Sequence, residues 1–322
     1  MNRLNRRNLS RQFWRVFTVF SLSLLTVVIT GHGAIVHSQN ISQNTTADSF
    51  ELTPIGLTLD PATDSPGNVP DGLDISPSPS ADGERGIVGN DDRFLMDLVT
   101  SAAYPWSAIG RLEQRDSPRG FVQGWCTGTL IGRDLVLTNA HCVVDLETHQ
   151  LTQASLVFRP NMIRGNSSDT TSATVLDYGT NFEDGNVADD WALLRLDEPL
   201  GDYYGEIGWL APALDRPQVI AALEEKLYLA GYSGDFPNGI PGYEPGETPG
   251  IHTNCSITAA VGDGRFLHTC DTSGGASGAP LIGLLNSGEY VILGLHAGST
   301  ALNGQTINYG MQVDRWQDAI RN

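Results

Sequence analysis

Basic residues are scarce in this 322-residue sequence, and Lys226 is its only lysine. Lysine and arginine together number 19 against 37 aspartate and glutamate residues, which gives a formal net charge of −18. A surface this acidic repels the phosphate backbone of nucleic acids, which proteins bind through clusters of positive charge. We therefore exclude nucleic acid as a partner and attribute the charge to solubility outside the cell.

The sequence also lacks a long apolar run. The apolar stretch near the N-terminus, VFTVFSLSLLTVVIT at residues 16–30, has 15 residues, whereas a membrane-spanning helix usually needs about 20. Several arginines precede it, as in the basic start of a secretory signal. We predict a signal peptide at residues 1–38, a secreted protein (extracellular or periplasmic) and no stable membrane association. The alternative is an uncleaved anchor on a membrane-tethered surface protein.

Only four cysteines occur, and none forms a CxxC motif. The HExxH motif is missing as well. These are spacings with which cysteine and histidine hold zinc, so we predict no metal and no cofactor. An even number of cysteines behind an export signal favours disulfides, for which three pairings exist. The four residues are Cys126, Cys142, Cys255 and Cys270.

Residues 39–86 show neither helical nor strand periodicity. Prolines are spread among Asp, Ser, Thr and Gly, and Arg85 is the only basic residue. We interpret the stretch as a disordered pro-segment removed after export, with a flexible linker as the alternative. Apolar sequence resumes at GERGIVGN, so we expect the mature N-terminus between Glu84 and Ile87.

From residue 87 onward, short β-rich runs alternate with Gly, Pro and Asn turns. TGTLIG and DLVLTNA are β-rich runs with Gly132 and Arg133 at the turn between them, as in a hairpin. Further runs are SLVF, ATVL, WALLRL, LYLAGY, PLIGLL and YVILGLH. Many short strands with almost no helical period predict an all-β fold.

DTSGGASGAP, at residues 271–280, places Ser277 among small residues and between the glycines Gly275 and Gly278. A serine nucleophile needs a carbonyl carbon within reach and backbone N–H groups aimed at the developing oxyanion. Side chains beside Ser277 would obstruct both, and Gly275 and Gly278 leave that space open. Ser277 is therefore a candidate nucleophile.

Two upstream motifs supply the partners that such a serine needs. TNAHC, at residues 138–142, contributes His141, and DWALL, at residues 190–194, contributes Asp190. The chain order His, Asp, Ser is the order of chymotrypsin. Asp189 competes with Asp190, and the Asp-x-Ala-Leu pattern with its following apolar strand favours Asp190.

Together the motifs resemble trypsin-like serine endopeptidases. Residues 87–93 (IVGNDDR), 104–110 (YPWSAIG) and 126–143 (CTGTLIGRDLVLTNAHCV) are similar to the start of mature bacterial glutamyl endopeptidases. The resemblance implies two Greek-key six-stranded β-barrels with the active site in the cleft between them, followed by a short C-terminal helix. Residues 87–205 would form the N-terminal barrel with His141 and Asp190, and residues 206–322 the C-terminal barrel with Ser277.

The resemblance also implies the role of each residue. His141 would take the proton of Ser277, Asp190 would orient the imidazole, and the N–H groups of Gly275 and Ser277 would form the oxyanion hole. A Cys126–Cys142 disulfide would bracket the histidine, leaving Cys255 and Cys270 to pair. The substrate would be a peptide or protein and the enzyme a monomer; the alternative is an inactive homologue that acts as a binding module.

One position departs from the trypsin-like pattern. Trypsin-like zymogens carry an aspartate just before the nucleophile, where it pairs with a freshly cut N-terminal ammonium. Here that position is Ala276. The sequence at Ile87 therefore cannot serve that switch, and glutamyl-type relatives share this departure.

The resemblance leaves the specificity open. Asp271, six residues before Ser277, stands where a tryptic enzyme attracts Arg or Lys. Thr272 and His296 stand where glutamyl endopeptidases bind a carboxylate side chain, which histidine and a hydroxyl can do through charge-assisted hydrogen bonds. Cleavage after Glu is the leading hypothesis, and the alternatives are cleavage after Arg or Lys and cleavage after neither type of residue. The remaining histidines without motif support are interpreted as structural or solvated: His149, His252 and His268.

Overall fold

The computed structural model describes residues 53–71, 73, 86–96, 98–145, 148–179 and 187–321. The predicted signal peptide lies outside these residues, as do Glu84 and Arg85 of the predicted processing site. No helix in the described ranges is both long and apolar enough to cross a membrane.

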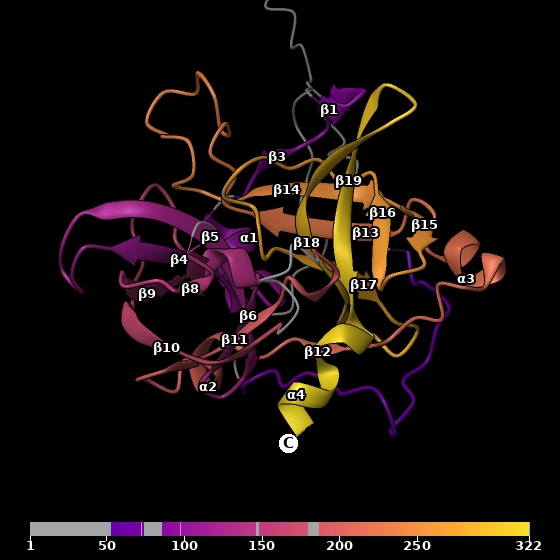
Figure 1. The fold of residues 1–322 in the computed structure, drawn as a ribbon, viewed down its shortest axis with the longest axis horizontal. Helices are drawn as coiled ribbons and strands as arrows, with labels where there is room; N and C mark the ends of the chain where they lie inside the picture. Colours follow the sequence, from indigo (N-terminus) through magenta and orange to yellow (C-terminus); the bar gives the residue numbers. More distant parts are fainter. Residues whose placement is uncertain are drawn as a thin grey trace, which may run out of the picture. The chain divides into compact units, whose positions relative to one another are not determined.

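Six antiparallel strands close into a barrel in the N-terminal half of residues 86–321 (Figure 1). Gly110 and Gly128 lie directly opposite each other on β4 and β5, and the buried ring of Phe158 from β9 packs over them. A Cβ atom at Gly110 would lie 2.4 Å from this ring, so the barrel interior requires glycine there. In order of pairing the strands are β10 (Thr171–Tyr178), β11 (Ala192–Leu196), β6 (Leu135–Thr138), β5 (Val122–Gly132), β4 (Ile109–Arg115) and β9 (Ser155–Pro160).

The C-terminal half forms a nine-stranded sheet. It runs through β15 (Ile257–Val261), β16 (Arg265–His268), β19 (Gln305–Gln312), β18 (Tyr290–Leu302), β17 (Pro280–Leu284), β13 (Leu227–Gly231), β14 (Gly250–Cys255) and β3 (Phe94–Leu95), while β12 (Gly208–Trp209) pairs with β18. The all-β prediction is confirmed. The second lobe has nine strands where six were expected. Residues 227–312 contribute seven of them, and β3 and β12 join from outside this range.

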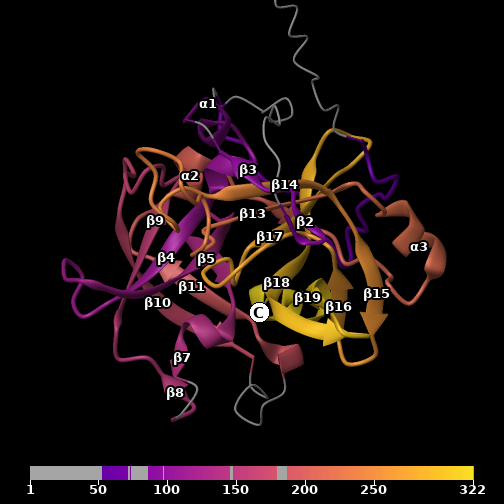
Figure 2. The same cartoon turned by 90° about the horizontal axis from the view of Figure 1, so that it is seen from above.

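The remaining helices and strands are short and lie around the two lobes (Figure 2). The predicted C-terminal helix is confirmed as α4 (Gln317–Arg321), which follows η5 (Val313–Arg315). The other helices and small strands are α1 (Leu98–Ala102), η1 (Trp106–Ala108), η2 (Ala140–Cys142), η4 (Val187–Asp189), α2 (Gly201–Tyr204), α3 (Pro217–Ala222), β1 (Gly86–Val88), β2 (Asn90–Asp91), β7 (Val144–Asp145) and β8 (Gln150–Leu151).

One hydrophobic core continues from the barrel into the second sheet. It includes Leu112 of β4, Leu194 of β11, Tyr228 of β13 and Ile282 of β17, each at most 1% exposed. A second cluster lies within the C-terminal lobe alone. Shared burial of this kind fixes the two lobes against each other, because separating them would return apolar surface to water.

The disulfides follow the pairing that the family resemblance implied. Cys126 of β5 is bonded to Cys142 in η2, and Cys255 of β14 is bonded to Cys270. Each closes a loop of about 15 residues, which the chain-entropy model values at about 3 kcal/mol. The first bond ties the turn that carries His141 to the barrel wall.

Residues 53–71 differ from the predicted disordered pro-segment, because they pack along the C-terminal lobe. Ile55 is fully buried in the core of that lobe, and its N–H group donates to the carbonyl of Leu284 at 2.9 Å. Ser65 pairs with Trp209 through two backbone hydrogen bonds of 2.9 Å. We call residues 53–71 the strap, and Figure 1 draws it as an indigo trace. Arg321 of α4 donates to the carbonyl of Ala62 within the strap.

We therefore predict that the strap stabilises the folded lobe. Ile55→Ala should lower the free energy of unfolding by about 2–5 kcal/mol, because it removes a fully buried side chain and leaves a cavity. Denaturant unfolding measures this loss. Val69→Ala is the matched control in the same strap, since Val69 is 36% exposed. Equal stability of both variants and the wild-type protein would mean that the strap is dispensable.

Candidate active site

His141 and Asp190 meet where two neighbouring barrel strands place them. His141 lies in η2 just after β6, and Asp190 just precedes β11, which pairs with β6 through Ala192 and Thr138. His141 Nδ1 lies 2.7 Å from Asp190 Oδ2, and the backbone N–H of His141 donates to Asp190 Oδ1 at 2.9 Å. Asp190 is 2% exposed. Two contacts to one buried carboxylate fix the orientation of the imidazole and leave Nε2 free of this pair.

Asp189, the competing candidate, faces a different partner. Its carboxylate pairs with the guanidinium of Arg315 in η5, which also donates to the carbonyl of Ala188 at 3.3 Å. The two adjacent aspartates therefore have different partners. Asp190 holds His141, whereas Asp189 links the barrel to the C-terminal segment.

The charge of Asp190 also changes the protonation of His141. Burial alone would lower the pKa of the imidazole, but the Asp190 carboxylate outweighs burial and raises that pKa above its ordinary value. The imidazolium is the form that the carboxylate stabilises. His141 can therefore accept a proton readily from a neighbouring hydroxyl.

Ser277 lies in the loop between β16 and β17, and this loop is seated on the barrel. Its carbonyl accepts the N–H of Thr127 at 2.8 Å, and the Thr127 hydroxyl donates to Gly275 at 3.0 Å. Gly278 has a φ of +84°, and a Cβ there would lie 2.3 Å from the hydroxyl oxygen of Thr138. Because Thr138 is three residues before His141, this close approach brings the serine loop to the histidine turn.

The loop presents two backbone N–H groups beside Ser277. Gly275 has a φ of +95°, and a Cβ atom there would lie 2.4 Å from Nε1 of Trp125. Only glycine fits this position without displacing the indole. Among the described residues, the N–H groups of Gly275 and Ser277 have no hydrogen-bond acceptor. Both donors are available to a ligand.

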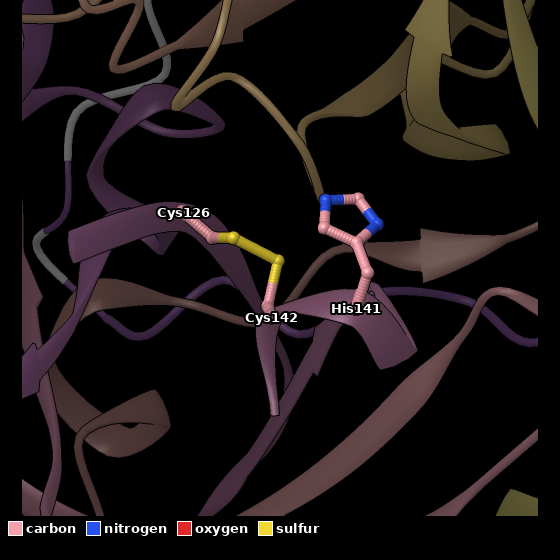
Figure 3. A group of neighbouring side chains, drawn as sticks. All are labelled: Cys126, His141 and Cys142. Atoms are coloured by element: carbon pink, nitrogen blue, oxygen red, sulfur yellow. A yellow bond between two sulfur atoms is a disulfide. The ribbon is translucent and has the colours of Figure 1, made fainter. Parts of the chain in front are cut away.

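Three metal-type donors gather at His141, namely the imidazole and the sulfur atoms of Cys126 and Cys142. Figure 3 shows the two sulfur atoms bonded to each other beside the histidine. Zinc binds cysteine as the thiolate, so sulfur atoms in a disulfide do not fit this metal. We draw no metal chemistry from this cluster.

Asp271 is buried and its carboxylate is already used. It accepts the N–H groups of Val88 at 2.7 Å and of Asp92 at 3.0 Å, and it lies 3.2 Å from Nδ1 of His252. Burial would raise the pKa of Asp271, but the contact with His252 and these backbone hydrogen bonds lower it overall. Asp271 is thus an ionised group that holds the segment around β1 and β2 against the site.

His296 of β18 lies beside Thr272, the other residue named in the glutamyl hypothesis. Its Nε2 is 3.1 Å from the Thr272 hydroxyl, and its Nδ1 is 3.1 Å from Nε2 of His268. Burial first, and the nearby charge of His141 second, lower the pKa of His296 to about 3. The imidazole is therefore neutral before a ligand arrives.

Two histidines without motif support belong to this cluster. His268 is fully buried beside His296, and His252 accepts the N–H of Asp271 at 2.7 Å. The local sequence marks neither of them. His268 and His296 lie on β16 and β18, which both pair with β19, so these two side chains meet only in the folded sheet. His149 is exposed at the turn between β7 and β8, as the solvated interpretation expects.

Comparisons with known proteins agree with the fold and with the motifs. Residues 126–291 match the model of the trypsin-like peptidase domain. The glutamyl endopeptidase of Bacillus licheniformis is 24% identical over 207 residues, which cover 64% of this chain and 57% of that protein. Mouse serine protease 23 is 26% identical over 221 residues, which cover 61% of this chain and 50% of that protein.

A solved structure of a Glu endopeptidase has the same fold. It matches with a TM-score of 0.57 at 20% identity, and the match covers 73% of this chain and 100% of the other. The chain spans between half and three fifths of the length of the curated relatives above.

Proposed function

We propose, from the premise that this chain belongs to the trypsin-like peptidase family, that it is a secreted serine endopeptidase using Ser277, His141 and Asp190. The observation that carries the proposal is the His141–Asp190 pair at the ends of β6 and β11, with the Ser277 loop seated on the neighbouring strands β5 and β6. The two disulfides support an oxidising compartment outside the cytoplasm.

The positions of these residues support the following reaction. The Ser277 hydroxyl attacks the peptide carbonyl carbon while Nε2 of His141 takes its proton. Asp190 stabilises the imidazolium, and the N–H groups of Gly275 and Ser277 bind the oxyanion. Collapse of the intermediate breaks the C–N bond, and His141 returns the proton to the leaving amine. Water then attacks the carbonyl carbon of the acyl-enzyme while His141 takes its proton. The bond to Ser277 breaks, the acid product leaves, and His141 returns the proton to the serine oxygen.

The catalytic region comprises residues 87–205 and 206–322 in this proposal. Removal of residues 1–38 during export and a cut between Glu84 and Ile87 would produce its N-terminus. Because the strap of residues 53–71 is held by buried contacts, it stays on the lobe after such a cut. The substrate is a peptide or protein, and the enzyme works as a monomer.

We propose specificity for glutamate at the residue before the cut. His296 and Thr272 are paired with each other, and a bound carboxylate would draw a proton onto the neutral imidazole. Asp271 argues against the tryptic alternative, because its oxygens accept the N–H groups of Val88 and Asp92 and it is 1% exposed. An incoming arginine would have to displace both donors.

His296→Ala tests this specificity. It should slow cleavage after Glu by about 30- to 150-fold, because losing a charged hydrogen-bond partner costs about 2–3 kcal/mol. Cleavage after an apolar residue by the same variant should change little, which separates loss of recognition from loss of fold. The measurement is kcat/KM on paired Glu, Arg and Leu peptides, with His149→Ala as the surface control.

The tryptic alternative gives the opposite pattern. It requires fast cleavage after Arg, a silent His296→Ala change and loss of that activity in Asp271→Ala. Wild-type enzyme that ignores the Glu peptide would end the glutamyl proposal and leave the endopeptidase proposal intact.

A further inference from the structure

Arg93, between β2 and β3, places a buried positive charge beside the candidate active site. Its side chain is 2% exposed. Its guanidinium donates to Asp91 at 2.6 and 2.9 Å and to Asp235 at 2.8 and 3.2 Å. The guanidinium carbon lies 4.8 Å from the centre of the Phe236 ring. A buried guanidinium is costly unless its donors are satisfied, so the two carboxylates are held in a fixed geometry.

Asp235 connects Arg93 to the loop that carries Ser277. It accepts the hydroxyl of Ser273 at 2.5 Å, four residues before Ser277. Partial burial disfavours the charge of Asp235, but hydrogen bonds from Arg93 and Ser273 lower its pKa overall. The carboxylate is therefore ionised at neutral pH and anchors Ser273 through a charge-assisted hydrogen bond.

The backbone of Ser273 closes the turn that presents the oxyanion donors. Its carbonyl accepts the N–H of Ala276 at 3.0 Å, and the N–H of Gly234 donates to Gly274 at 2.6 Å. The segment next to Asp235 thus runs along residues 273–276 and holds them. The N–H groups of Gly275 and Ser277 belong to this turn.

We infer that Arg93 is a positioning residue of the peptidase site, acting through Asp235 on Ser273. It supplies the fixed positive charge that a freshly cut N-terminal ammonium supplies in trypsin-like zymogens. The inference rests on the proposed function. Ala276, where such zymogens carry aspartate, is fully buried and has no charge to offer an ammonium. The charge of Arg93 exists before and after processing, so the geometry of the site does not wait for a new N-terminus.

A second attachment keeps Arg93 in place. The N–H groups of Val88 and Asp92, on either side of β2, both donate to the buried Asp271 carboxylate. The segment that carries Arg93 is therefore bound at two points to residues 271–273. Displacing this segment would therefore also displace the loop that carries Ser277.

The test compares Arg93→Met and Ser273→Ala with wild-type full-length protein. Met keeps an unbranched side chain and removes the guanidinium of Arg93, and Ser273→Ala removes only the hydroxyl. Both should lower kcat on the best wild-type peptide by about 10- to 100-fold, because small misplacements of catalytic groups cost that much. KM should change less, and reaction with a fluorophosphonate should slow in parallel. Ser273→Thr keeps the hydroxyl and should restore the rate.

Arg133→Met is the matched control. Arg133 pairs with Asp202 at 2.8 Å on the surface of the other lobe, and its side chain is 68% exposed. Hydrogen exchange of the peptide that covers residues 271–280 gives a readout independent of activity. Exchange there should be faster in Arg93→Met and Ser273→Ala, and unchanged in Arg133→Met.

Unchanged exchange together with a kcat within twofold of wild type in Ser273→Ala would overturn the inference, even if Arg93→Met fails to fold. A protein blocked from processing by Glu84→Ala and Arg85→Ala should keep its kcat within about threefold. Loss of activity there would show that a free N-terminus is needed. If wild-type protein cleaves no peptide, the proposed function fails, and the exchange data still decide whether Arg93 orders the turn.

Discussion

Ser277→Ala is expected to lower the rate of peptide hydrolysis by about a millionfold while the protein still folds. The hydroxyl is the attacking atom, and removing the nucleophile of a triad abolishes the covalent route. The backbone contacts of this residue do not depend on the hydroxyl, since its carbonyl accepts the N–H of Thr127. Initial rates on a peptide substrate, together with the thermal unfolding midpoint, measure the two halves of the expectation.

Ser287→Ala is the matched control for this variant, because Ser287 is exposed in the turn after β17. A fluorophosphonate should label the wild-type protein and Ser287→Ala, but not Ser277→Ala. Turnover retained by Ser277→Ala would remove this residue from the role of nucleophile. A wild-type protein that is neither labelled nor active would favour the inactive homologue that acts as a binding module.

The residues of the candidate triad could be predicted because each lies in a short motif whose chemistry limits its neighbours. The choice between Asp189 and Asp190 depended on pattern alone. In the structure, the pairing of β11 with β6 directs Asp190 to His141, and Arg315 from the far end of the chain takes Asp189. A contact across 126 positions leaves no mark on the local sequence.

The strap has a sequence pattern that indicates an ordered segment, but its overall composition favoured disorder. Ile55, Leu57 and Leu59 alternate with other residues, which is the period of a half-buried extended segment. Ile55 is fully buried, and the two leucines pack against the same core. The surrounding prolines and acidic residues dominated the composition, so the whole stretch was predicted to be disordered.

The histidine cluster marks the limit of sequence reasoning about specificity. His296 stands in a motif, but His268 and His252 come from β16 and β14 and gain their meaning only from the folded sheet. The same holds for Asp271. Its position suggested a substrate-binding carboxylate, and only its bonds to Val88 and Asp92 reveal that it holds the protein's own backbone.

Asp190→Asn is expected to fold and to lose about 10,000-fold in kcat. The amide of asparagine would donate to Nδ1 of His141, where the carboxylate now accepts. The proton of the imidazole would then sit on Nε2, which could no longer take the proton of Ser277. Asp189→Asn is the matched control one residue away, and it should lose only the contact with Arg315. If Asp189→Asn is the damaging change instead, Asp190 is not the third residue.

The pH profile gives this prediction a second measurement. Asp190 raises the pKa of His141 against the opposing effect of burial, and catalysis requires the neutral imidazole. In the wild-type enzyme the acid limb of kcat/KM should therefore lie above the ordinary histidine value of about 6.5. Removing the carboxylate leaves burial unopposed, so the limb should move to lower pH in Asp190→Asn and stay in place in Asp189→Asn. A limb that moves in neither variant would mean that a group other than His141 limits the rate at acid pH.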